Sequence, residues 1–325
     1  MAHKFERDLA IFADGLSKQF GDRSAVSGVS LCIPAGSVFA LLGPNGAGKS
    51  VTVRMLTTLL RPDSGSASIF GDDLLTNPGA VRRRIALTGQ FASIDEDMTG
   101  RDNLELIARL FGLAPRSARH RADELLEVFG LTDAGAKAAR VYSGGMRRRL
   151  DIAASLVRRP QILFLDEPTT GLDPASRTQV WNTVRGLADE GMTVLLTTQY
   201  LEEADRLAGR IAVMDRGTII AEGTSSELKA RVGEGTFSLQ LADDRHGTAA
   251  LAAVEGLVRS PRHEGRRVSF QLATSTRASA VLAALDAASI PLHEFAYAHP
   301  SLDEVFLALT GDAAEHLSAR AEHPQ

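Results

Sequence analysis

Cysteine and long apolar stretches are scarce in this sequence. Its 325 residues include one cysteine, Cys32, which excludes an internal disulfide and a multi-cysteine zinc site and fits a reducing compartment. No apolar run approaches the roughly 18 residues that cross a bilayer. Residues 1–10 contain four charged side chains and no signal-peptide core. We therefore expect a soluble chain that reaches a membrane only through a partner.

The sequence also lacks an excess of charge of either sign. Its 36 basic and 40 acidic residues give a net charge of −4, so no overall electrostatic attraction to nucleic acid is expected. With 44% hydrophobic and 23% charged residues, the composition is that of a folded globular protein. At about 150 residues per domain, the length predicts two domains, or one large domain with an extension.

The first two thirds of the chain predict an α/β domain. Two strand-like segments, residues 25–33 and 37–42, flank a Pro-Ala-Gly turn, and apolar residues recur at helical spacing from Val51 to Leu60. Later segments that are continuously apolar and follow helical stretches predict buried parallel strands. They are residues 161–165, 193–197 and 211–214.

Between residue 42 and the predicted helix lies a glycine-rich loop with the P-loop pattern. Its residues are Gly43, Pro44, Asn45, Gly46, Ala47, Gly48, Lys49 and Ser50. Glycines allow backbone N–H groups to turn toward phosphate oxygens, and the helix N-terminus adds a partial positive charge. Lys49 can reach the β- and γ-phosphates, and Ser50 can offer its hydroxyl to Mg²⁺. The loop predicts a nucleotide site; the alternative is a glycine turn without a ligand.

A second element of the same chemistry is the apolar strand that ends in Asp166 and Glu167. Such a strand presents both carboxylates at its tip. We expect Asp166 to hold Mg²⁺ through water, and Glu167 to orient and deprotonate the attacking water. The alternative is a strand that ends in two solvated acids.

The predicted organisation has two domains and a tail. Residues 1–224 form the α/β domain, and residues 91–140 are an all-helical insert within it. Alternating strands and alanine-rich helices predict a small α+β domain over residues 225–312, and residues 313–325 are expected to be a flexible tail. Two capping pairs mark helix starts. They are Thr99 with Asp102, and Ser301 with Glu304.

The segment Tyr142-Ser143-Gly144-Gly145-Met146 precedes the strand that ends in Asp166. Together with the P-loop, it resembles the signature motif of the ATP-binding cassette (ABC) ATPases, and this resemblance covers residues 10–225. In its details the chain resembles the daunorubicin/doxorubicin-resistance-type ATP-binding subunits, and this similarity continues through residues 301–307. The resemblance implies a P-loop NTPase fold of the ABC ATPase type, with an inserted helical subdomain.

The resemblance also implies functions for single positions. Phe20 would stack on adenine, Val26 would pack against the same base, and Gln90 would contact Mg²⁺ and the attacking water. Asp173 matches the loop that communicates between two ATP sites. In this family two copies face each other head to tail. Each ATP therefore lies between the P-loop of one copy and the Ser143–Gly145 turn of the other.

Three positions depart from the family pattern. Gln199 stands where relatives usually have histidine; its amide can donate to the γ-phosphate but cannot titrate, which leaves Glu167 as the general base. Val51 replaces a threonine whose hydroxyl contacts the α-phosphate, so weaker ATP binding is predicted. Met146 replaces a glutamine and alters the signature turn. Arginines 147–149 are expected to form a solvated basic face, or else to contact the membrane partner or the ATP interface.

These observations and the resemblance together predict the motor subunit of an ABC exporter. ATP and Mg²⁺ would close two copies of the chain, and separate multi-span membrane subunits would convert closing and reopening into transport. We expect docking on the helical insert and the Gln90 loop, with Phe91 and Met98 as candidates for an exposed patch. The chain would then lie at the cytoplasmic face of the cell membrane as a peripheral subunit.

The transported compound cannot be inferred from the motifs. Subfamily resemblance favours efflux of a drug or antibiotic, and export of a lipid or polysaccharide is the alternative. A soluble ABC ATPase that acts on the ribosome or nucleic acid is a rival; the single cassette, the net charge and the absence of a heptad run disfavour it, so no nucleic-acid partner is expected. Residues 225–312 could bind a regulatory ligand, stabilise the homodimer or cover the cassette.

Overall fold

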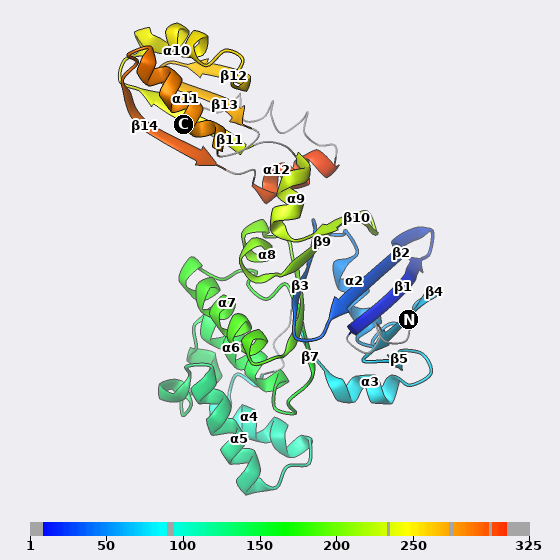
Figure 1. Ribbon diagram of the computed structural model, residues 1–325. Helices are drawn as coiled ribbons and strands as arrows, with labels where there is room; N and C mark the ends of the chain where they lie inside the picture. The colour runs from blue at the N-terminus through cyan, green and yellow to red at the C-terminus, as the bar shows by residue number, and fades with distance from the viewer. Residues whose placement is uncertain (1–8, 90–93, 233–234, 273–275, 299–300, 311–325) are drawn as a thin grey trace. The chain divides into compact units, whose positions relative to one another are not determined.

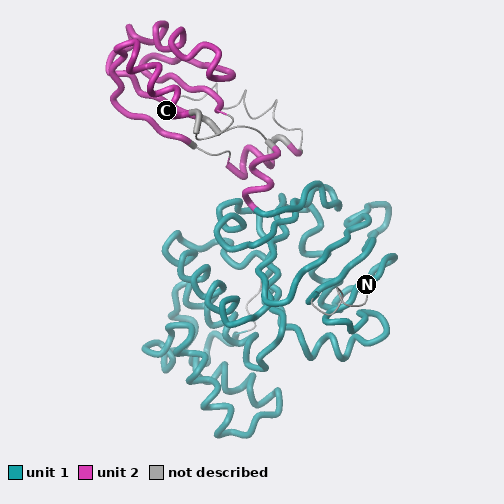
Figure 2. The backbone as a smooth tube through the Cα atoms, viewed as in Figure 1, with its two compact units in different colours: residues 1–224 teal, residues 225–325 magenta. Residues whose placement is uncertain are grey.

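The chain divides into two compact units, residues 1–224 and residues 225–325 (Figure 2). The computed structural model describes residues 9–89, 94–232, 235–272, 276–298 and 301–310. The predicted tail, residues 313–325, lies outside them. Within the described part of the chain, no helix combines the length and the apolar character needed to span a membrane.

Unit 1 is built on a six-stranded sheet. Its strands are β3 (Val38–Leu42), β6 (Ile85–Thr88), β7 (Ile162–Asp166), β8 (Thr193–Thr198), β9 (Arg210–Asp215) and β10 (Thr218–Gly223). They lie in the order β10-β9-β3-β8-β7-β6, and all neighbours are parallel except β9 and β10. The three predicted parallel strands are confirmed as β7, β8 and β9. Because parallel strands end at the same edge, the segments after β3, β7 and β8 come together there.

A second, antiparallel sheet completes the core of unit 1. Its strands are β1 (Leu9–Phe20), β2 (Arg23–Pro34), β4 (Ser64–Ile69) and β5 (Asp72–Asp73). The strand order is β2-β1-β4-β5. Ile11 and Val29 of this sheet belong to one apolar cluster with Phe39 of β3, Phe164 of β7 and Met55. Met55 lies in the helix after the P-loop, so the loop is anchored in this core at both of its ends.

The helices of unit 1 include the one predicted after the P-loop and those of the helical insert (Figure 1). Their bounds are α2 (Lys49–Leu56), α3 (Pro78–Arg84), α4 (Gly100–Leu110), α5 (Pro115–Val128), η2 (Thr132–Ala134), η3 (Ala139–Val141), α6 (Gly144–Ser155), α7 (Pro174–Asp189) and α8 (Leu201–Leu207). Thr99 Oγ1 accepts a hydrogen bond from the Asp102 N–H at 3.1 Å, which confirms this capping pair. In the insert, α4 and α5 pack against each other and bury Leu104, Ala108 and Leu125.

Unit 2 is the expected small α+β domain. Its elements are α9 (Ser225–Val232), β11 (Gly235–Leu241), η4 (Asp244–His246), α10 (Gly247–Ala253), β12 (Arg259–Glu264), β13 (Arg267–Leu272), α11 (Thr276–Ala287), β14 (Leu292–Ala298) and α12 (Leu302–Thr310). The antiparallel sheet has the order β12-β13-β11-β14. The elements from β11 to β14 therefore form a β-α-β-β-α-β unit, made of β11, α10, β12, β13, α11 and β14. At α12, Glu304 N–H donates to Ser301 Oγ and Ser301 N–H donates to the Glu304 carboxylate, which confirms the second capping pair.

The core of unit 2 follows from strand alternation. Phe237 and Leu239 of β11 and Phe270 of β13 point to one face of the sheet, because successive side chains on a strand alternate between faces. That face packs on Ala250 of α10 and Val281 of α11. The rings of Phe237 and Phe270 lie 5.6 Å apart between centroids. This core is entirely apolar.

Candidate functional site

The P-loop connects β3 to α2, as the sequence predicts. Two of its glycines are required by close backbone neighbours. A Cβ on Gly48 would come 2.5 Å from the Ala25 carbonyl oxygen, and its φ of +101° is one that L side chains rarely adopt. A Cβ on Gly43 would clash with the carbonyl group of Met214. The loop is therefore packed tightly on the sheet, with Gly48 directly before the first turn of α2.

Lys49 is buried at the start of α2. Its Nζ donates to the carbonyl oxygens of Gly43 at 2.7 Å and Pro44 at 3.0 Å. Its ammonium also forms an ion pair with the Glu167 carboxylate at 3.6 Å. Burial lowers the pKa of Lys49, and the charge of Glu167 opposes that shift. The cation thus lies between the P-loop and the end of β7.

Asp166 and Ser50 face each other across the same edge of the sheet. Ser50 Oγ donates to Asp166 Oδ1 at 2.9 Å, and Thr197 Oγ1 of β8 donates to the same oxygen at 2.5 Å. A carboxylate and a hydroxyl at this distance are hard oxygen ligands of the kind that Mg²⁺ prefers. The described residues include no cluster of three or more His, Cys, Asp or Glu side chains fit for a metal. Mg²⁺ is usually held by one or two carboxylates together with substrate phosphates, and Asp166 with Ser50 could supply the protein ligands.

Glu167 follows β7 in an unusual backbone conformation. Its φ is +48°, in the left-handed region that non-glycine residues seldom occupy. Its N–H donates to the carbonyl oxygen of Thr197 at 3.2 Å and to Thr197 Oγ1 at 3.0 Å. Thr170 Oγ1 donates to Glu167 Oε2 at 3.3 Å. Because Glu167 also pairs with Lys49, its carboxylate is directed toward the P-loop.

These groups surround a cavity of about 430 Å³. Its lining residues are Phe20, Arg23, Ala25, Asn45, Gly46, Gly48, Lys49, Ser50, Val51 and Glu167. Phe20 is 51% exposed, and Lys18 Nζ lies over its ring at 5.8 Å from the centroid. Val26, which we expected beside the base, is fully buried, and Ala25 takes its place on the wall. The reason is strand parity, because Val26 points into the core and Ala25 to the opposite face of β2.

Arg23 is a cavity residue that the sequence analysis missed. It opens β2 and is exposed, and its guanidinium would lie 3.7 Å from a Cβ placed on Gly46. It therefore adds a positive charge beside the phosphate loop. The only signal in the sequence was its position three residues after Phe20, which is too weak to single out one arginine among many.

The signature turn and the Asp173 loop lie next to each other in the folded chain. Ser143 is the N-cap of α6 and accepts from the Met146 N–H at 3.2 Å. Asp173 is the N-cap of α7 and accepts from the N–H and hydroxyl of Ser176, which lower its pKa. A Cβ on Gly145 would come 2.5 Å from the Cβ of Ser176. Neither Ser143 nor Asp173 lines the P-loop cavity of its own chain.

Of the two glutamines predicted at the site, the structure describes Gln199. Gln199 directly follows β8 and is half-buried, and the neighbouring Thr198 carbonyl accepts from the Gly43 N–H at 3.1 Å. This bond places Gln199 at the same edge of the sheet as the P-loop. Gln90 lies outside the described residues.

Arginines 147–149 do not form a freely solvated basic face. Arg147 pairs with Glu96 at 2.9 Å, and Arg149 Nη1 donates to the Phe129 carbonyl at 2.7 Å. Arg148 donates to the carbonyl oxygens of Gly89, Asp166 and Pro168. All three side chains therefore hold parts of unit 1 together.

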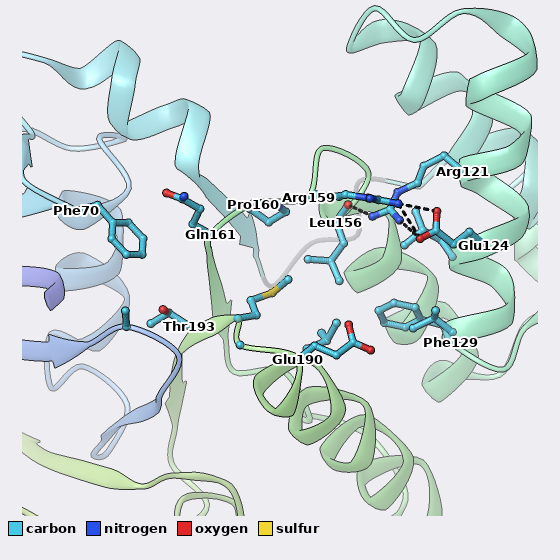
Figure 3. A pocket seen from close by; sticks show the side chains of 16 residues that line it. Phe70, Arg121, Glu124, Phe129, Leu156, Arg159, Pro160, Gln161, Glu190 and Thr193 are labelled. Carbon is cyan, nitrogen blue, oxygen red and sulfur yellow. Dashed lines mark hydrogen bonds and ion pairs between the residues drawn. The ribbon is translucent and has the colours of Figure 1, made fainter. Parts of the chain in front are cut away.

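A larger cavity, of about 590 Å³, lies at α5. Figure 3 shows Phe70 and Thr193 on one wall and Arg121 and Glu124 on the other. Arg121 and Arg159 both pair with Glu124, at 2.7 Å and 3.0 Å. The lining has two arginines and two glutamates, Glu124 and Glu190, so its charges balance and the cavity offers little to a phosphate group. The smaller cavity at the P-loop is the candidate nucleotide site.

Comparison with known proteins agrees with this fold and site. A family model described as "ABC transporter" matches residues 26–170, and one described as "ATP-binding protein DrrA1-3-like, C-terminal domain" matches residues 223–310. Among solved structures, cbiO1 from Clostridium perfringens, part of the ABC transporter complex cbiONQ, is similar with a TM-score of 0.63 and 26% identity. That comparison covers 69% of this chain and 91% of cbiO1. Both results indicate the class of ABC ATPases.

Two relatives match almost the whole chain. The daunorubicin/doxorubicin resistance ATP-binding protein DrrA of Streptomyces peucetius is 51% identical, over 95% of this chain and 94% of that protein. The linearmycin resistance ATP-binding protein LnrL of Bacillus subtilis is 34% identical, over 92% of this chain and 97% of that protein. The chain therefore belongs to the ABC transporter ATP-binding proteins of the DrrA type. Members of this family are ATPases that dimerise and work with separate membrane subunits.

Proposed function

We propose that this chain is the ATP-hydrolysing motor subunit of an exporter that removes a drug or antibiotic from the cell. The observation that carries the proposal is that Lys49, Ser50 and Glu167 line one cavity, with Asp166 hydrogen-bonded to Ser50. The cargo class is supported by the names of two full-length relatives, which confer resistance to daunorubicin/doxorubicin and to linearmycin. Export of a lipid or polysaccharide is the alternative cargo.

The proposed nucleotide pose follows the cavity wall. Adenine stacks on the exposed ring of Phe20 and lies against Ala25. The P-loop amides and Lys49 hold the phosphates. Arg23 provides a further positive charge at the rim. Lys49 now donates to carbonyl oxygens of its own loop, and phosphate oxygens would replace them as acceptors.

The hydrolytic roles follow from the end of β7. Ser50 and Asp166 would hold Mg²⁺, which neutralises charge on the β- and γ-phosphates when it is bound. Gln90 is proposed as a further contact to Mg²⁺ and to the attacking water. Glu167 orients that water and accepts its proton. Gln199, which cannot titrate, positions the γ-phosphate by hydrogen bonding.

A second copy of the chain would complete the site. Ser143 and Gly144 are exposed at the N-terminus of α6, where backbone N–H groups and the helix dipole favour an anion. They do not line the P-loop cavity of their own chain, and we propose that they contact the γ-phosphate of an ATP bound to the other copy. Asp173 lies beside this turn and would meet the opposite copy as well.

The proposed membrane-subunit contact is on the helical insert. Leu106 and Leu110 of α4 and Phe111 at its C-terminus are 44%, 76% and 49% exposed. Phe111 also lines a groove of about 350 Å³, together with residues of α3, β6, α4 and α6 and with Arg158. This differs in detail from our expectation, because Met98 is half-buried and Phe91 lies outside the described residues. Docking of a membrane subunit here would place the chain at the cytoplasmic face of the membrane.

Transport in vesicles tests the proposed function. The chain would be co-purified with its membrane subunits and assayed for ATP-dependent uptake of anthracyclines, lipids and polysaccharides into inverted vesicles. We expect uptake of a drug by the wild type and none by Lys49→Ala. Uptake of a lipid or polysaccharide alone would replace the cargo assignment. Co-purification with ribosomes or DNA in place of a membrane protein would overturn the transport function.

A further inference from the structure

The backbone that carries Glu167 needs support. A left-handed conformation at a non-glycine residue costs on the order of 1–3 kcal/mol and persists only where the surroundings determine it strongly. Glu167 has this conformation, and it is followed by Pro168 and Thr169 before the chain reaches the Asp173 loop. Two charged side chains contact residues 166–169: the partly buried Arg148 of α6 and the fully buried Glu203 of α8.

Arg148 of α6 holds this segment through its main chain. Its Nε donates to the Pro168 carbonyl at 2.9 Å and its Nη2 to the Asp166 carbonyl at 3.3 Å. These carbonyl oxygens lie on either side of Glu167. The Arg148 side chain is 12% exposed, and its Nη1 donates to the Gly89 carbonyl at 2.8 Å. Burial lowers the pKa of Arg148, and the charges of Asp151, Asp166 and Glu203 oppose that shift.

Glu203 of α8 holds the same segment through a side chain. It is fully buried, and its Oε1 accepts from Thr169 Oγ1 at 2.8 Å and from Trp181 Nε1 at 3.0 Å. Both donors are themselves buried, so they need this acceptor. Burial raises the pKa of Glu203, while hydrogen bonds from Thr198, Thr169 and Trp181 work against the rise. A buried carboxyl group without such partners would be strongly unfavourable.

We propose that Arg148 and Glu203 are positioning residues that fix residues 166–169 and thereby aim the Glu167 carboxylate at the attacking water. This inference depends on the proposed function, in which Glu167 is the general base. The two helices that carry these residues also start at other parts of the proposed site. The helix of Arg148 begins at the Ser143 turn, and that of Glu203 follows Gln199. The base is thereby attached to both elements that are proposed to contact the γ-phosphate.

Conservative substitutions separate positioning from general stability. Thr169→Val keeps the shape of the side chain and removes its hydroxyl donor to Glu203. We expect kcat for ATP hydrolysis by the full chain to fall on the order of tenfold to a hundredfold, as small misplacements of a catalytic group do. The dissociation constant for ATP should stay at the wild-type value. The separate variant Thr169→Ser, which keeps a hydroxyl group, should have the kcat of the wild type. Thr183→Val is the matched control, because the half-buried Thr183 of α7 donates only to the Gln179 carbonyl of its own helix.

Substitutions of the two charged residues complete the test. Glu203→Gln keeps an oxygen where Thr169 and Trp181 donate, so its kcat should stay close to the wild type, whereas Glu203→Ala should behave like Thr169→Val. Arg148→Lys should also lower kcat without changing ATP affinity, because one ammonium cannot reproduce the planar fork that reaches both carbonyls. Arg149→Lys, the neighbouring arginine that contacts Phe129 instead, is its control.

The outcomes distinguish this inference from the function on which it depends. If Glu167→Gln hydrolyses ATP as fast as the wild type, the proposed role of Glu167 is wrong. If Glu167→Gln is inactive while Thr169→Val and Arg148→Lys retain wild-type kcat, the positioning role is wrong. A parallel loss of kcat, ATP affinity and thermal stability in these two variants would also overturn it, because that pattern indicates structural support alone.

Discussion

The two units of this chain bury different kinds of side chain. Among the described residues, the buried polar and charged side chains all belong to unit 1, and they include Lys49, Asp151, Thr197 and Glu203. The core of unit 2 is built from apolar residues around Phe237 and its neighbours. Burial of polar groups is unfavourable unless they are paired, so they persist where a site requires them. The comparison indicates that unit 1 contains the chemistry, and that any binding role of unit 2 depends on its surface.

The largest expected effect is on the chemistry of unit 1. Glu167→Gln should lower kcat for ATP hydrolysis by about 10²–10⁴, the range typical of a lost general base. ATP binding should persist, because the P-loop and Lys49 are unchanged. Single-turnover hydrolysis and equilibrium ATP binding measure the two quantities separately. Activity near the wild type would show that unit 1 keeps its base elsewhere.

The second prediction tests whether the units are independent. Phe270→Ala removes a fully buried ring from unit 2 and should lower its free energy of unfolding by about 3–5 kcal/mol. ATP affinity should be unchanged, because the described residues that line the P-loop cavity all belong to unit 1. Denaturant unfolding and ATP titration of the full chain provide the measurements. Phe295→Ala, at a position 55% exposed, is the control. Loss of ATP binding in Phe270→Ala alone would show that ATP binding depends on the folding of unit 2.

A smaller effect is expected at the wall of the nucleotide cavity. Val51→Thr adds a hydroxyl at a position that lines the cavity beside Ser50. A new hydrogen bond to a charged phosphate is typically worth about 1.5–3 kcal/mol, so ATP should bind more tightly than to the wild type. Calorimetric titration measures the dissociation constant, with Val51→Ala as the control for side-chain size. An unchanged constant in Val51→Thr would show that residue 51 does not reach the phosphates.

The smallest predicted effect is a pH dependence of stability in unit 1. The pKa of Glu203 in the folded chain lies above its ordinary value of 4.5 because burial disfavours the carboxylate. In the unfolded chain Glu203 has its ordinary pKa. At pH values between the ordinary and the raised pKa, the folded state keeps a proton that the unfolded state has lost, so the free energy of unfolding falls as pH rises through that window. Glu203→Gln has no such proton.

Thermal unfolding measured at increasing pH tests this sign. The midpoint of Glu203→Gln relative to the wild type should increase as pH rises above 4.5, and the difference should level off beyond the raised pKa. Glu202→Gln, at the exposed neighbouring position, is the control. A difference that stays constant, or that shrinks with rising pH, would contradict a raised pKa of Glu203.

The parts of the fold that local patterns determine were predictable. Buried parallel strands such as β7 and the capped helices α4 and α12 have strong local signals, and all are present. Strands β12 and β14 were not predicted. All six residues of β12 are exposed, so its sequence has no apolar alternation, and its identity as a strand depends on pairing with β13.

At the site too, residues within local motifs were predictable, whereas contacts between distant parts of the sequence were not. Sequence motifs pointed to Lys49 and Glu167, which meet in one cavity. The exchange of Val26 for Ala25 shows how a shift of one residue along a strand moves a side chain to the other face. The contact of Thr169 with Glu203 joins residues 34 positions apart, and no spacing rule within one sequence indicates it.

The close approach of α6 and α7 at Gly145 affects how variants of the signature turn are to be interpreted. A methyl group at this position would meet Ser176 within the same chain, before any nucleotide or second copy is present. Gly145→Ala would therefore push two helices apart in the isolated subunit. Inactivity of that variant cannot be assigned to a missing phosphate contact. Ser143→Ala causes no such clash, but it removes the N-cap hydroxyl of α6, so thermal stability has to be measured beside activity when it is used to probe the shared interface.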